Sequence, residues 1–373
     1  MANLLVTGGA GFIGANFVRY WRERHAGDGL VVLDALTYAG NAANLAGLDG
    51  VAFVHGDIRD TALVRSLIAD HAIDTIVHFA AESHVDRSIE GPDAFISTNV
   101  VGTHSLLKAA KAAWLDDGSG RPHRFHHIST DEVYGSLGAD DPAFSETTPY
   151  APNSPYSASK AASDHLVRAY HHTFGLEVTT SNCSNNYGPF QFPEKLIPLF
   201  LINCLTGKPL PIYGDGMNVR DWLHVEDHCR GIELILANGR PGETYNIGGG
   251  EELPNIAVID AICAAVDDAF ARDGALAQRF PEAPAAAGKS SATLKSFVKD
   301  RLGHDRRYAI DETKARDELG YRPSRGFAEG LASTIAWYLA NESWWRSVTD
   351  GSYRDLAGPD HVSPPGPGSS GKA

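Results

Sequence analysis

Two adjacent carboxylates, Asp131 and Glu132, stand in the stretch HHISTDEVYGS, where a run of strand-forming residues gives way to a loop. Like charges this close repel each other, and burying either one is costly unless a neighbour compensates. A solvated acidic turn would explain the pair without any chemical role. If their surroundings split the two pKa values, however, the pair could supply one general acid and one general base.

A tyrosine and a lysine follow at helical spacing in YSASK, with Tyr156 four residues before Lys160. If a helix begins here, the two side chains share one face and lie one turn apart. An ammonium group beside a phenol lowers the phenol's pKa from about 10, so the phenolate could act as a base near neutral pH. Thr130 ends the predicted strand before the two acids, at the kind of position where open α/β sheets bind their ligands.

A glycine-rich turn, TGGAGFIG, directly follows the first predicted strand and opens a helix. Gly9, Gly11 and Gly14 fit the pattern G-x-G-x-x-G, which brings a pyrophosphate close to the backbone and to the positive end of a helix. Asp34 ends the second predicted strand, twenty residues beyond Gly14. A carboxylate there would bind ribose hydroxyls and repel a 2′-phosphate, so the sequence predicts NAD rather than NADP.

Predicted strands and predicted helices, which would position these residues, alternate along the first half of the chain. The pattern predicts an α/β, Rossmann-like doubly wound parallel sheet with a smaller C-terminal substrate-binding lobe. The predicted strands are NLLVTG, LVVLDAL, VAFVHGD, TIVHFAA, RFHHIST and LEVTTSN, and the segments of helical period include Ala15–Arg24, Ala62–Ala69, Val100–Ala113 and Ala158–Phe174.

The division into domains follows a change of composition near Pro189, after which proline and glycine become more frequent. We expect an NAD-binding domain over residues 1–188 and a lobe that binds mainly the substrate over 189–342, and residues 222–250 could return to the first domain. Residues 283–292 resemble a flexible insertion. The Pro/Gly/Ser-rich residues 357–373 predict a disordered tail.

Composition narrows the class of protein. Of 373 residues, 43% are hydrophobic and 21% are charged, as in ordinary globular proteins. The formal charge of −14 argues against nucleic-acid and anionic-membrane binders. The four cysteines lack C-x-x-C spacing, so we expect reduced core thiols and no metal site. With no signal peptide or long apolar run in the sequence, we expect a cytoplasmic protein.

These motifs, together with LTYAGN, FAAESHVDRS, SNNYGPFQFPEKLIP, PIYGDGMNVRDWLHV and GHDRRYAID, run from Met1 to about Asn341. They resemble the extended short-chain dehydrogenase/reductase superfamily and, within it, the dTDP-glucose 4,6-dehydratase family. The resemblance implies an NAD-dependent lyase that acts on a nucleotide-linked glucose, with dTDP-glucose as the expected substrate. It also implies a homodimer.

The resemblance gives the paired acids a role. NAD accepts a hydride from C4 of the sugar while the Thr130, Tyr156 and Lys160 set removes the hydroxyl proton. Glu132 then takes the C5 proton, and Asp131, kept protonated, donates to the departing C6 hydroxyl. Return of the hydride to C6 gives a 4-keto-6-deoxy sugar and regenerates NAD.

Other residues match family positions in the cofactor and substrate sites. Asp57 and Ile58 are expected near the adenine, although an ordinary turn at a strand end explains them almost as well. Arg220 and Arg301 match phosphate clamps, with a surface salt bridge as the alternative. The expected cofactor-binding residues are Gly8, Gly9, Gly11, Phe12, Ile13, Gly14, Asp34, Ala35, Leu36, Thr37, Asp57, Ile58, Phe79, Ala80, Ala81, Thr98, Tyr156, Lys160 and Asn186. The expected substrate-binding residues are Ser83, Thr130, Asn185, Lys195, Leu196, Pro211, Ile212, Tyr213, Arg220, Asn255, Arg301 and His304. Leu302 departs from the proline that the family often has there.

Three other functions remain open at this point. A UDP-sugar 4-epimerase would need the tyrosine, the lysine and NAD, but no acid pair beside the threonine. A sugar-nucleotide decarboxylase would handle a uronic acid. A non-catalytic NAD-binding module would have no need of Tyr156 or Lys160, and both are present.

Overall fold

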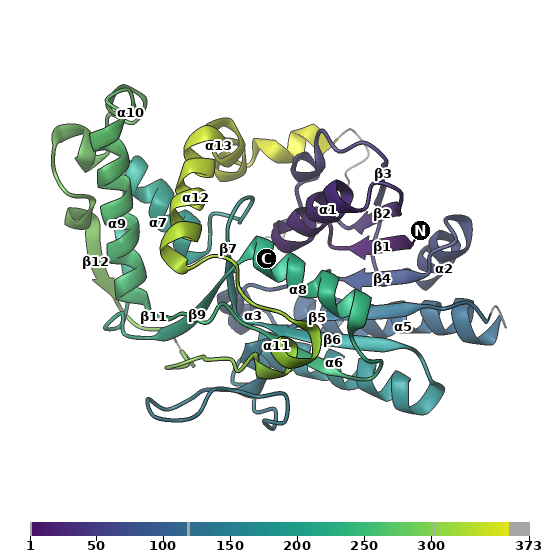
Figure 1. Ribbon diagram of the computed structural model, residues 1–373. Helices are drawn as coiled ribbons and strands as arrows, with labels where there is room; N and C mark the ends of the chain where they lie inside the picture. Colours follow the sequence, from purple (N-terminus) through teal and green to yellow (C-terminus); the bar gives the residue numbers. More distant parts are fainter. Residues whose placement is uncertain (1, 118–119, 302, 358–373) are drawn as a thin grey trace, which may run out of the picture.

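A parallel sheet of seven strands forms the centre of the larger lobe in the computed structural model, which describes residues 2–117, 120–301 and 303–357 (Figure 1). The strand order is β10-β6-β5-β4-β1-β2-β3. The order reverses between β1 and β4, as in doubly wound sheets that bind dinucleotides at this switch point. The predicted α/β fold is therefore confirmed. The strands are β1 (Asn3–Thr7), β2 (Gly29–Asp34), β3 (Val51–His55), β4 (Thr75–His78), β5 (Arg124–Thr130), β6 (Val178–Cys183) and β10 (Thr244–Ile247).

Alternating apolar residues bury both faces of this sheet. Leu4 and Val6 of β1 pack in one core with residues of α1 and α8, whereas Leu5 packs in a second core with residues of α2, α5 and α6. Successive side chains of a strand point to opposite faces, so an apolar strand needs helices on both sides. The helices are α1 (Phe12–Arg24), α2 (Thr61–Asp70), α3 (Val85–Glu90), α4 (Asp93–Phe95), α5 (Thr103–Lys111), α6 (Pro155–Phe174) and α8 (Val225–Asn238).

Helix boundaries differ from the sequence pattern where caps or turns decide them. α6 begins at Pro155 because Ser154 caps it: its hydroxyl accepts from the Ser157 N–H at 3.0 Å, and the Ser157 hydroxyl accepts from the Ser154 N–H at 3.1 Å. The segment predicted as one helix over Val100–Ala113 is α5 flanked by two π-helical stretches, η2 (Ile96–Gly102) and η3 (Ala112–Asp116).

The smaller lobe is built around α7, α9 and α12, whose apolar faces share one core (Figure 1). Its strands form a three-stranded sheet of order β11-β9-β7 and a two-stranded sheet of β12 and β8. The elements are β7 (Asn185–Tyr187), α7 (Leu196–Leu205), β8 (Leu210–Tyr213), β9 (Val219–His224), β11 (Glu252–Pro254), α9 (Asn255–Arg272), α10 (Leu276–Arg279), β12 (Lys295–Val298) and α12 (Phe327–Ala340). α11 (Thr313–Leu319) packs against β10 and α8 of the larger lobe.

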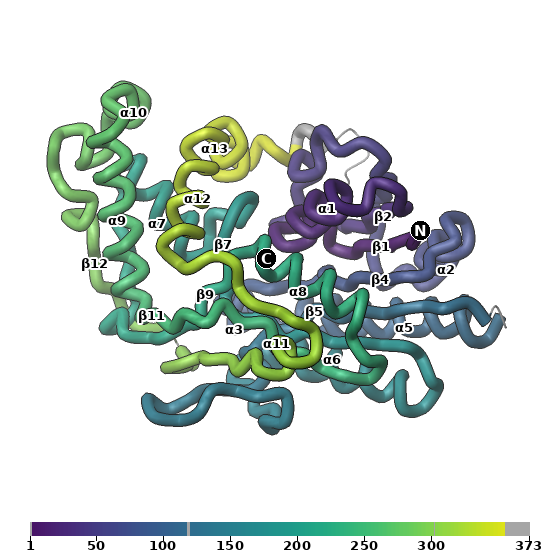
Figure 2. Tube along the Cα trace, viewed as in Figure 1, coloured from purple at the N-terminus to yellow at the C-terminus, as the bar shows by residue number. Residues whose placement is uncertain are grey.

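Segments after residue 188 also contribute to the larger lobe. β10 pairs with β6 in parallel, and α8 packs beside α1. Near the C-terminus, α13 (Glu342–Asp350) and η7 (Ser352–Ala357) carry the chain back towards η1 (Ala42–Leu45), as the tube in Figure 2 shows. There the Trp344 indole N–H donates to Asn44 Oδ1 at 2.8 Å.

The predicted flexible insertion is a packed connection instead. Residues 283–292 contain η5 (Pro284–Ala287) and the start of η6 (Ser291–Leu294). Ser291 is buried, and its hydroxyl donates to Asp267 Oδ1 of α9 at 2.6 Å. Residues 358–373, nearly all of the predicted tail, lie outside the described part of the chain.

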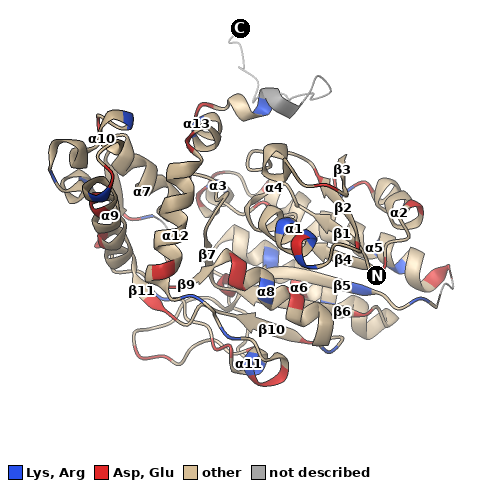
Figure 3. Ribbon diagram, turned by 45° about the horizontal axis from the view of Figure 1, so that its top comes forward, with Lys and Arg blue, Asp and Glu red and all other residues tan. Residues whose placement is uncertain are grey.

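Acidic and basic residues are interspersed along the elements of both lobes in the view of Figure 3. Several form partly exposed ion pairs, such as Arg240 with Glu318 at 2.6 Å. Within residues 2–117, 120–301 and 303–357, no helix is both long enough and apolar enough to cross a membrane.

Candidate active site

One cavity lies at the carboxyl ends of the central strands. Its lining comes from the glycine loop after β1, the ends of β2, β4 and β5, the start of α6 and the loops around β7. Chain segments far apart in sequence therefore meet at the edge where doubly wound sheets bind ligands.

The glycine loop has the shape that a dinucleotide requires. A Cβ atom on Gly14 would lie 2.3 Å from the Gly8 carbonyl oxygen, and one on Gly8, whose φ is +69°, would lie 2.6 Å from the Ala80 nitrogen. At Gly11 the only neighbour within 4 Å would be the Gly8 oxygen, at 3.3 Å. The loop thus packs tightly against the protein at two glycines and leaves the third accessible from the cavity, which fits a pyrophosphate.

Asp34 lines the cavity beside the glycine loop. Its Oδ2 accepts from the Ala10 N–H at 2.9 Å and its Oδ1 accepts from the Leu36 N–H at 2.8 Å. Each oxygen keeps a further lone pair, which fits a pair of ribose hydroxyls. Burial raises the pKa of Asp34, and these two N–H groups oppose the increase.

Most of the predicted cofactor residues line this cavity. Gly9 and Leu36 do not. A Cβ atom on Gly9 would lie 2.7 Å from the Val32 side chain, so this glycine packs closely against β2. Asp57 lines the cavity but is paired with Arg59 at 2.6 Å. The predicted residues in the lining are Gly8, Gly11, Phe12, Ile13, Gly14, Asp34, Ala35, Thr37, Asp57, Ile58, Phe79, Ala80, Ala81, Thr98, Tyr156, Lys160 and Asn186.

The paired acids also line the cavity, in the 3₁₀ turn η4 (Asp131–Tyr134) that follows β5. Thr130 caps the turn: its hydroxyl accepts from the Glu132 N–H at 3.3 Å and donates to Asp131 Oδ1 at 3.3 Å. Asp131 is 2% exposed, and its Oδ2 has no hydrogen-bond partner among the described residues. An acid in such a place is most stable when it holds its proton.

The two carboxyl groups differ in their electrostatic surroundings. Burial raises the pKa of Asp131 well above its usual value, and the neighbouring Glu132 raises it further. Burial also raises the pKa of Glu132, but Lys195 and Arg220 oppose that increase. Asp131 is therefore the group that keeps its proton, and Glu132 is the one that ionises more readily.

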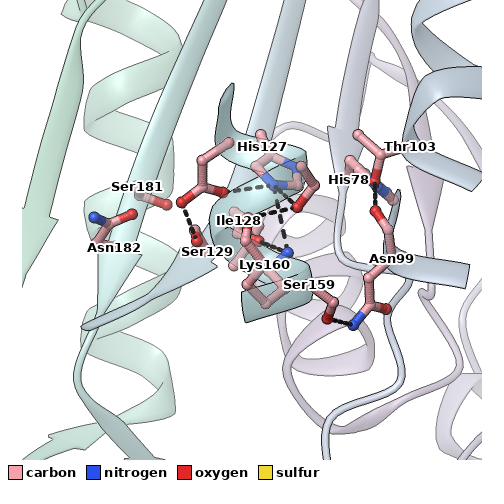
Figure 4. Close-up of polar contacts among 12 residues, drawn as sticks. His78, Asn99, Thr103, His127, Ile128, Ser129, Ser159, Lys160, Ser181 and Asn182 are labelled. Atoms are coloured by element: carbon pink, nitrogen blue, oxygen red, sulfur yellow. Dashed lines mark hydrogen bonds and ion pairs between the residues drawn. The ribbon is translucent and has the colours of Figure 1, made fainter. Parts of the chain in front are cut away.

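Tyr156 differs from the sequence-based expectation. Burial raises its pKa well above 10, with the Glu132 charge adding to the effect and a hydrogen bond with Thr130 opposing it. Lys160 Nζ donates to the Ile128 carbonyl at 2.7 Å and lies 3.4 Å from His127 Nε2 (Figure 4). In the chain alone the pKa of Tyr156 is thus raised, whereas the sequence predicted that it would be lowered, because burial and the Glu132 charge have the larger effect.

The predicted substrate residues fall into two sets. Ser83, Thr130, Asn185 and Lys195 line the cavity, and Lys195 Nζ donates to the Ser83 carbonyl at 3.2 Å. The others lie outside its lining, and Ile212 is buried in the core of the smaller lobe. This second set is Leu196, Pro211, Ile212, Tyr213, Arg220, Asn255, Arg301 and His304.

Two arginines near the paired acids have different surroundings. Arg220 is buried, donates to the Asp305 carbonyl at 2.9 Å and lies over the Tyr308 ring at 4.2 Å. Arg301 pairs with Asp86 at 3.3 Å and lies over the Tyr213 ring at 4.8 Å. The positive charges of both arginines oppose the increase in the pKa of Glu132, so both guanidinium groups lie near that carboxyl group. Leu302 lies outside the described residues.

Several residues that line the cavity were not predicted. Part of the signal was present in the quoted motifs, since Tyr38 and Gly40 belong to LTYAGN and Glu194 to FQFPEK. The described residues contain no cluster of three or more His, Cys, Asp or Glu side chains that could hold a metal ion. The unpredicted lining residues include Tyr38, Gly40, Arg59, Glu82, Ser97, Ser129, Cys183, Ser184, Gln191, Phe192 and Glu194.

Comparison with known proteins gives the family. A family model described as GDP-mannose 4,6 dehydratase matches residues 5–334. The chain is 58% identical over 359 residues to a dTDP-glucose 4,6-dehydratase of Xanthomonas campestris pv. campestris, with 95% of this chain and 98% of that protein covered. The chain belongs to the dTDP-glucose 4,6-dehydratase family. It is thus a member of the extended short-chain dehydrogenase/reductase superfamily, as the motifs predicted.

Solved structures of this family and of a related enzyme share the fold. A dTDP-glucose 4,6-dehydratase from Streptomyces venezuelae, with NAD and TYD bound, is 50% identical with a TM-score of 0.82, covering 93% of this chain and 99% of that chain. A UDP-glucose 4-epimerase from Thermotoga maritima, with UDP-glucose, is 27% identical with a TM-score of 0.78, covering 91% and 99%. The dehydratase family and the epimerase therefore use one scaffold.

Proposed function

We propose that this protein removes water from a nucleotide-linked glucose, with dTDP-glucose as the substrate, to give the 4-keto-6-deoxy sugar. The observation that carries the proposal is the pair Asp131 and Glu132, which shares one cavity with Thr130, Tyr156 and a dinucleotide-binding loop. The relatives named dTDP-glucose 4,6-dehydratase support the choice of reaction and of nucleotide.

NAD is the proposed cofactor, and it supplies the acceptor for a hydride from C4 of the sugar and the donor of that hydride to C6. The glycine loop and the Asp34 carboxylate fit it, and the structural relative from Streptomyces venezuelae holds NAD. Gly11 leaves backbone N–H groups accessible to the phosphates. The Asp34 carboxylate accepts hydrogen bonds from the ribose hydroxyls, and its negative charge disfavours a 2′-phosphate.

Tyr156 is the proposed base for the C4 hydroxyl, and Thr130 orients that hydroxyl. Since burial raises the pKa of Tyr156, the phenol can lose its proton only with a positive charge close by. Lys160 is the cation on the same face of α6, and it lines the same cavity. Its ammonium therefore has to remain protonated and well placed for the base to work.

The two acids divide the elimination between them. Glu132 takes the C5 proton, which the neighbouring ketone makes acidic. Asp131 gives its proton to the departing C6 hydroxyl, a task for which its strongly raised pKa is suited. One carboxyl group has to be ionised to take the proton from C5, and the other has to be protonated to donate to the hydroxyl on C6. The surroundings of Glu132 and Asp131 favour these two opposite protonation states.

Binding of the sugar nucleotide would draw on the second set of residues. Arg220 and Arg301 are the proposed phosphate clamps, because planar guanidinium groups bind phosphate oxygens in pairs. The Arg301 ion pair with Asp86 is partly exposed, so exchanging that partner for a phosphate costs little. Homodimer assembly and a cytoplasmic location stay predictions from the sequence.

A 4-epimerase is the alternative that the shared scaffold favours most. It would invert the configuration at C4 and needs neither an acid at Asp131 nor a base at Glu132. Burying these two carboxyl groups would then cost desolvation free energy without serving the reaction. A decarboxylase would act on a uronic acid, and a non-catalytic NAD-binding module would leave every sugar unchanged.

One incubation separates these functions. The protein is mixed with dTDP-, UDP-, GDP- and ADP-glucose and with UDP-glucuronic acid, and the products are analysed by mass spectrometry and NMR. The proposal predicts loss of one water from dTDP-glucose and a 4-keto-6-deoxy product. A product of unchanged mass with inverted C4 would instead identify an epimerase, and loss of carbon dioxide would identify a decarboxylase.

A further inference from the structure

A polar group lies behind Lys160, on the side away from the cavity. His127 of β5 is fully buried, and Asp164 of α6 is 5% exposed. Neither residue lines the cavity, so neither is positioned to touch a substrate or cofactor there. A buried carboxylate is costly unless it is paired, so its place behind a site lysine needs a physical reason.

Distances connect the carboxylate to the lysine. Asp164 Oδ1 lies 3.0 Å from His127 Nε2, and the same nitrogen lies 3.4 Å from Lys160 Nζ. The other oxygen, Asp164 Oδ2, accepts from the Ser129 hydroxyl at 2.7 Å. Lys160 and Asp164 are four residues apart on α6 and so share one face of that helix. Figure 4 shows Lys160 beside His127.

The charges in this group follow from burial. Burial lowers the pKa of His127 well below its usual value, and the Lys160 charge lowers it further, so the ring is neutral. Burial also lowers the pKa of Lys160, and the charge of Asp164 opposes this change. The pKa of Asp164 is raised to about 6 by burial, against the opposing charge of Lys160. At neutral pH the buried ammonium therefore faces a buried carboxylate across a neutral ring.

Other titratable groups around the pair do not supply this negative charge. Burial lowers the pKa of His78 and raises that of Cys183 to about 12, which leaves both neutral. Burial raises the pKa of Tyr134 and Tyr150 above the usual value, so neither phenol is ionised. The surrounding groups are His78 from β4, His127 from β5, Cys183 from β6, Tyr134 from η4, Tyr150 from the loop before α6, and Lys160 and His165 from α6 itself.

We propose that Asp164, together with His127, is a positioning residue that keeps the Lys160 ammonium charged and held at the edge of the cavity. Deprotonated Lys160 would give Tyr156 no positive charge, so the group acts on the base through the lysine. This inference rests on the proposed function where it concerns turnover. The coupling between Asp164 and Lys160 is a property of the chain alone.

Asp164→Asn tests the role in turnover. In the wild type, activity should be lost as the pH falls through about 6, where Asp164 takes up its proton. In the variant that acid limb should disappear, and the alkaline limb, where Lys160 loses its proton, should move to lower pH. The kcat at neutral pH should fall about tenfold, less than the roughly 10²–10⁴-fold that a general acid or base itself contributes, with a smaller change in KM.

Asp227→Asn is the matched control, because Asp227 is also buried but accepts hydrogen bonds from Ser324 and pairs with Arg230 instead. It should lower thermal stability without moving either limb of the pH profile. Ser129→Ala is the second variant, in case Asp164→Asn does not fold. Removing that hydroxyl takes a hydrogen bond from the carboxylate, so the acid limb should move to higher pH.

An experiment without turnover tests the coupling itself. Aspartate labelled with carbon-13 at the carboxyl should show signals from Asp164 and from Asp221 that titrate near pH 6 in the wild type, and the signal that is missing in Asp164→Asn belongs to Asp164. In Lys160→Met the same signal should titrate at higher pH, since the opposing positive charge is gone. Unchanged pH limbs in Asp164→Asn, or no effect of Lys160→Met on that titration, would overturn the inference. Failure of every sugar nucleotide to lose water would count against the proposed function alone.

Discussion

The inner group of the site (Thr130, Asp131, Glu132, Tyr156 and Lys160) and the outer group (Tyr213, Asp300, Arg301 and His304) place polar residues in opposite surroundings. Asp131 and Lys160 are buried, whereas Tyr213 is 38% exposed and the Arg301 side chain 29% exposed. Burial shifts the pKa values of the inner group far enough to separate an acid from a base. Water partly screens the charges of Asp300 and Arg301, which suits them to binding rather than to proton transfer, whereas the His304 side chain is only 8% exposed.

The two groups also differ in how the chain builds them. The inner group comes from the end of β5, the turn after it and the first turns of α6, all held by the central sheet. The outer group comes from β8 and from the loop after β12, on the smaller lobe. Changes in the inner group should therefore affect kcat most, and changes in the outer group should affect KM.

The largest effects should follow from the paired acids. Asp131→Asn and Glu132→Gln should each lower kcat by about 10²–10⁴-fold, because each removes one general acid or base from the elimination. Steady-state assays of water loss from dTDP-glucose measure this, with thermal melting as a check that the variants fold. Full dehydration by Glu132→Gln would contradict the assignment.

A smaller effect is expected at the cofactor end of the cavity. Denatured wild-type protein should release NAD and not NADP. Asp34→Ala should weaken NAD binding about 10–100-fold, since hydrogen bonds to a charged group contribute roughly 1.5–3 kcal/mol. Calorimetry of cofactor-stripped protein measures the affinity. Asp28→Ala is the control, because Asp28 binds Ala2 and Trp21 outside the cavity; equal losses in both variants would argue against a ribose contact.

The smallest effect belongs to the outer group. Arg301→Ala should raise KM about tenfold and leave kcat nearly unchanged, if the guanidinium binds a phosphate of the substrate. Arg306→Ala is the control from the same loop, because the Arg306 side chain pairs with the exposed carboxylate of Asp215. A fall in kcat with an unchanged KM would move Arg301 into the inner group.

Much of the fold could be predicted because its signals are local. The six apolar strands, the glycine loop and the Tyr156–Lys160 spacing each occupy a short window of sequence. β10 was missed because Thr244–Ile247 is only four residues long and lies far from its partner β6 in sequence. The π-helical stretches beside α5 were missed because their residues have the same helical pattern as the helix itself.

The site was predicted in part for the same reason. Motif positions found the acids, the tyrosine and most of the cofactor contacts, but not the direction of the Lys160 side chain. That direction depends on the Ile128 carbonyl and on His127, which lie on a neighbouring strand. The pairing of Asp164 with His127 joins α6 to β5, and no spacing within either segment indicates it.

Bound-cofactor absorbance after mixing with dTDP-glucose tests the central claim most directly, because it separates the two tasks of the inner group. Tyr156→Phe removes the base for the first oxidation and should show no absorbance signal of NADH. Asp131→Asn and Glu132→Gln should still form that signal and then stall, since they retain Tyr156 and lose only the elimination. If Asp131→Asn or Glu132→Gln abolished the signal as completely as Tyr156→Phe, the division between base and acid pair would be wrong.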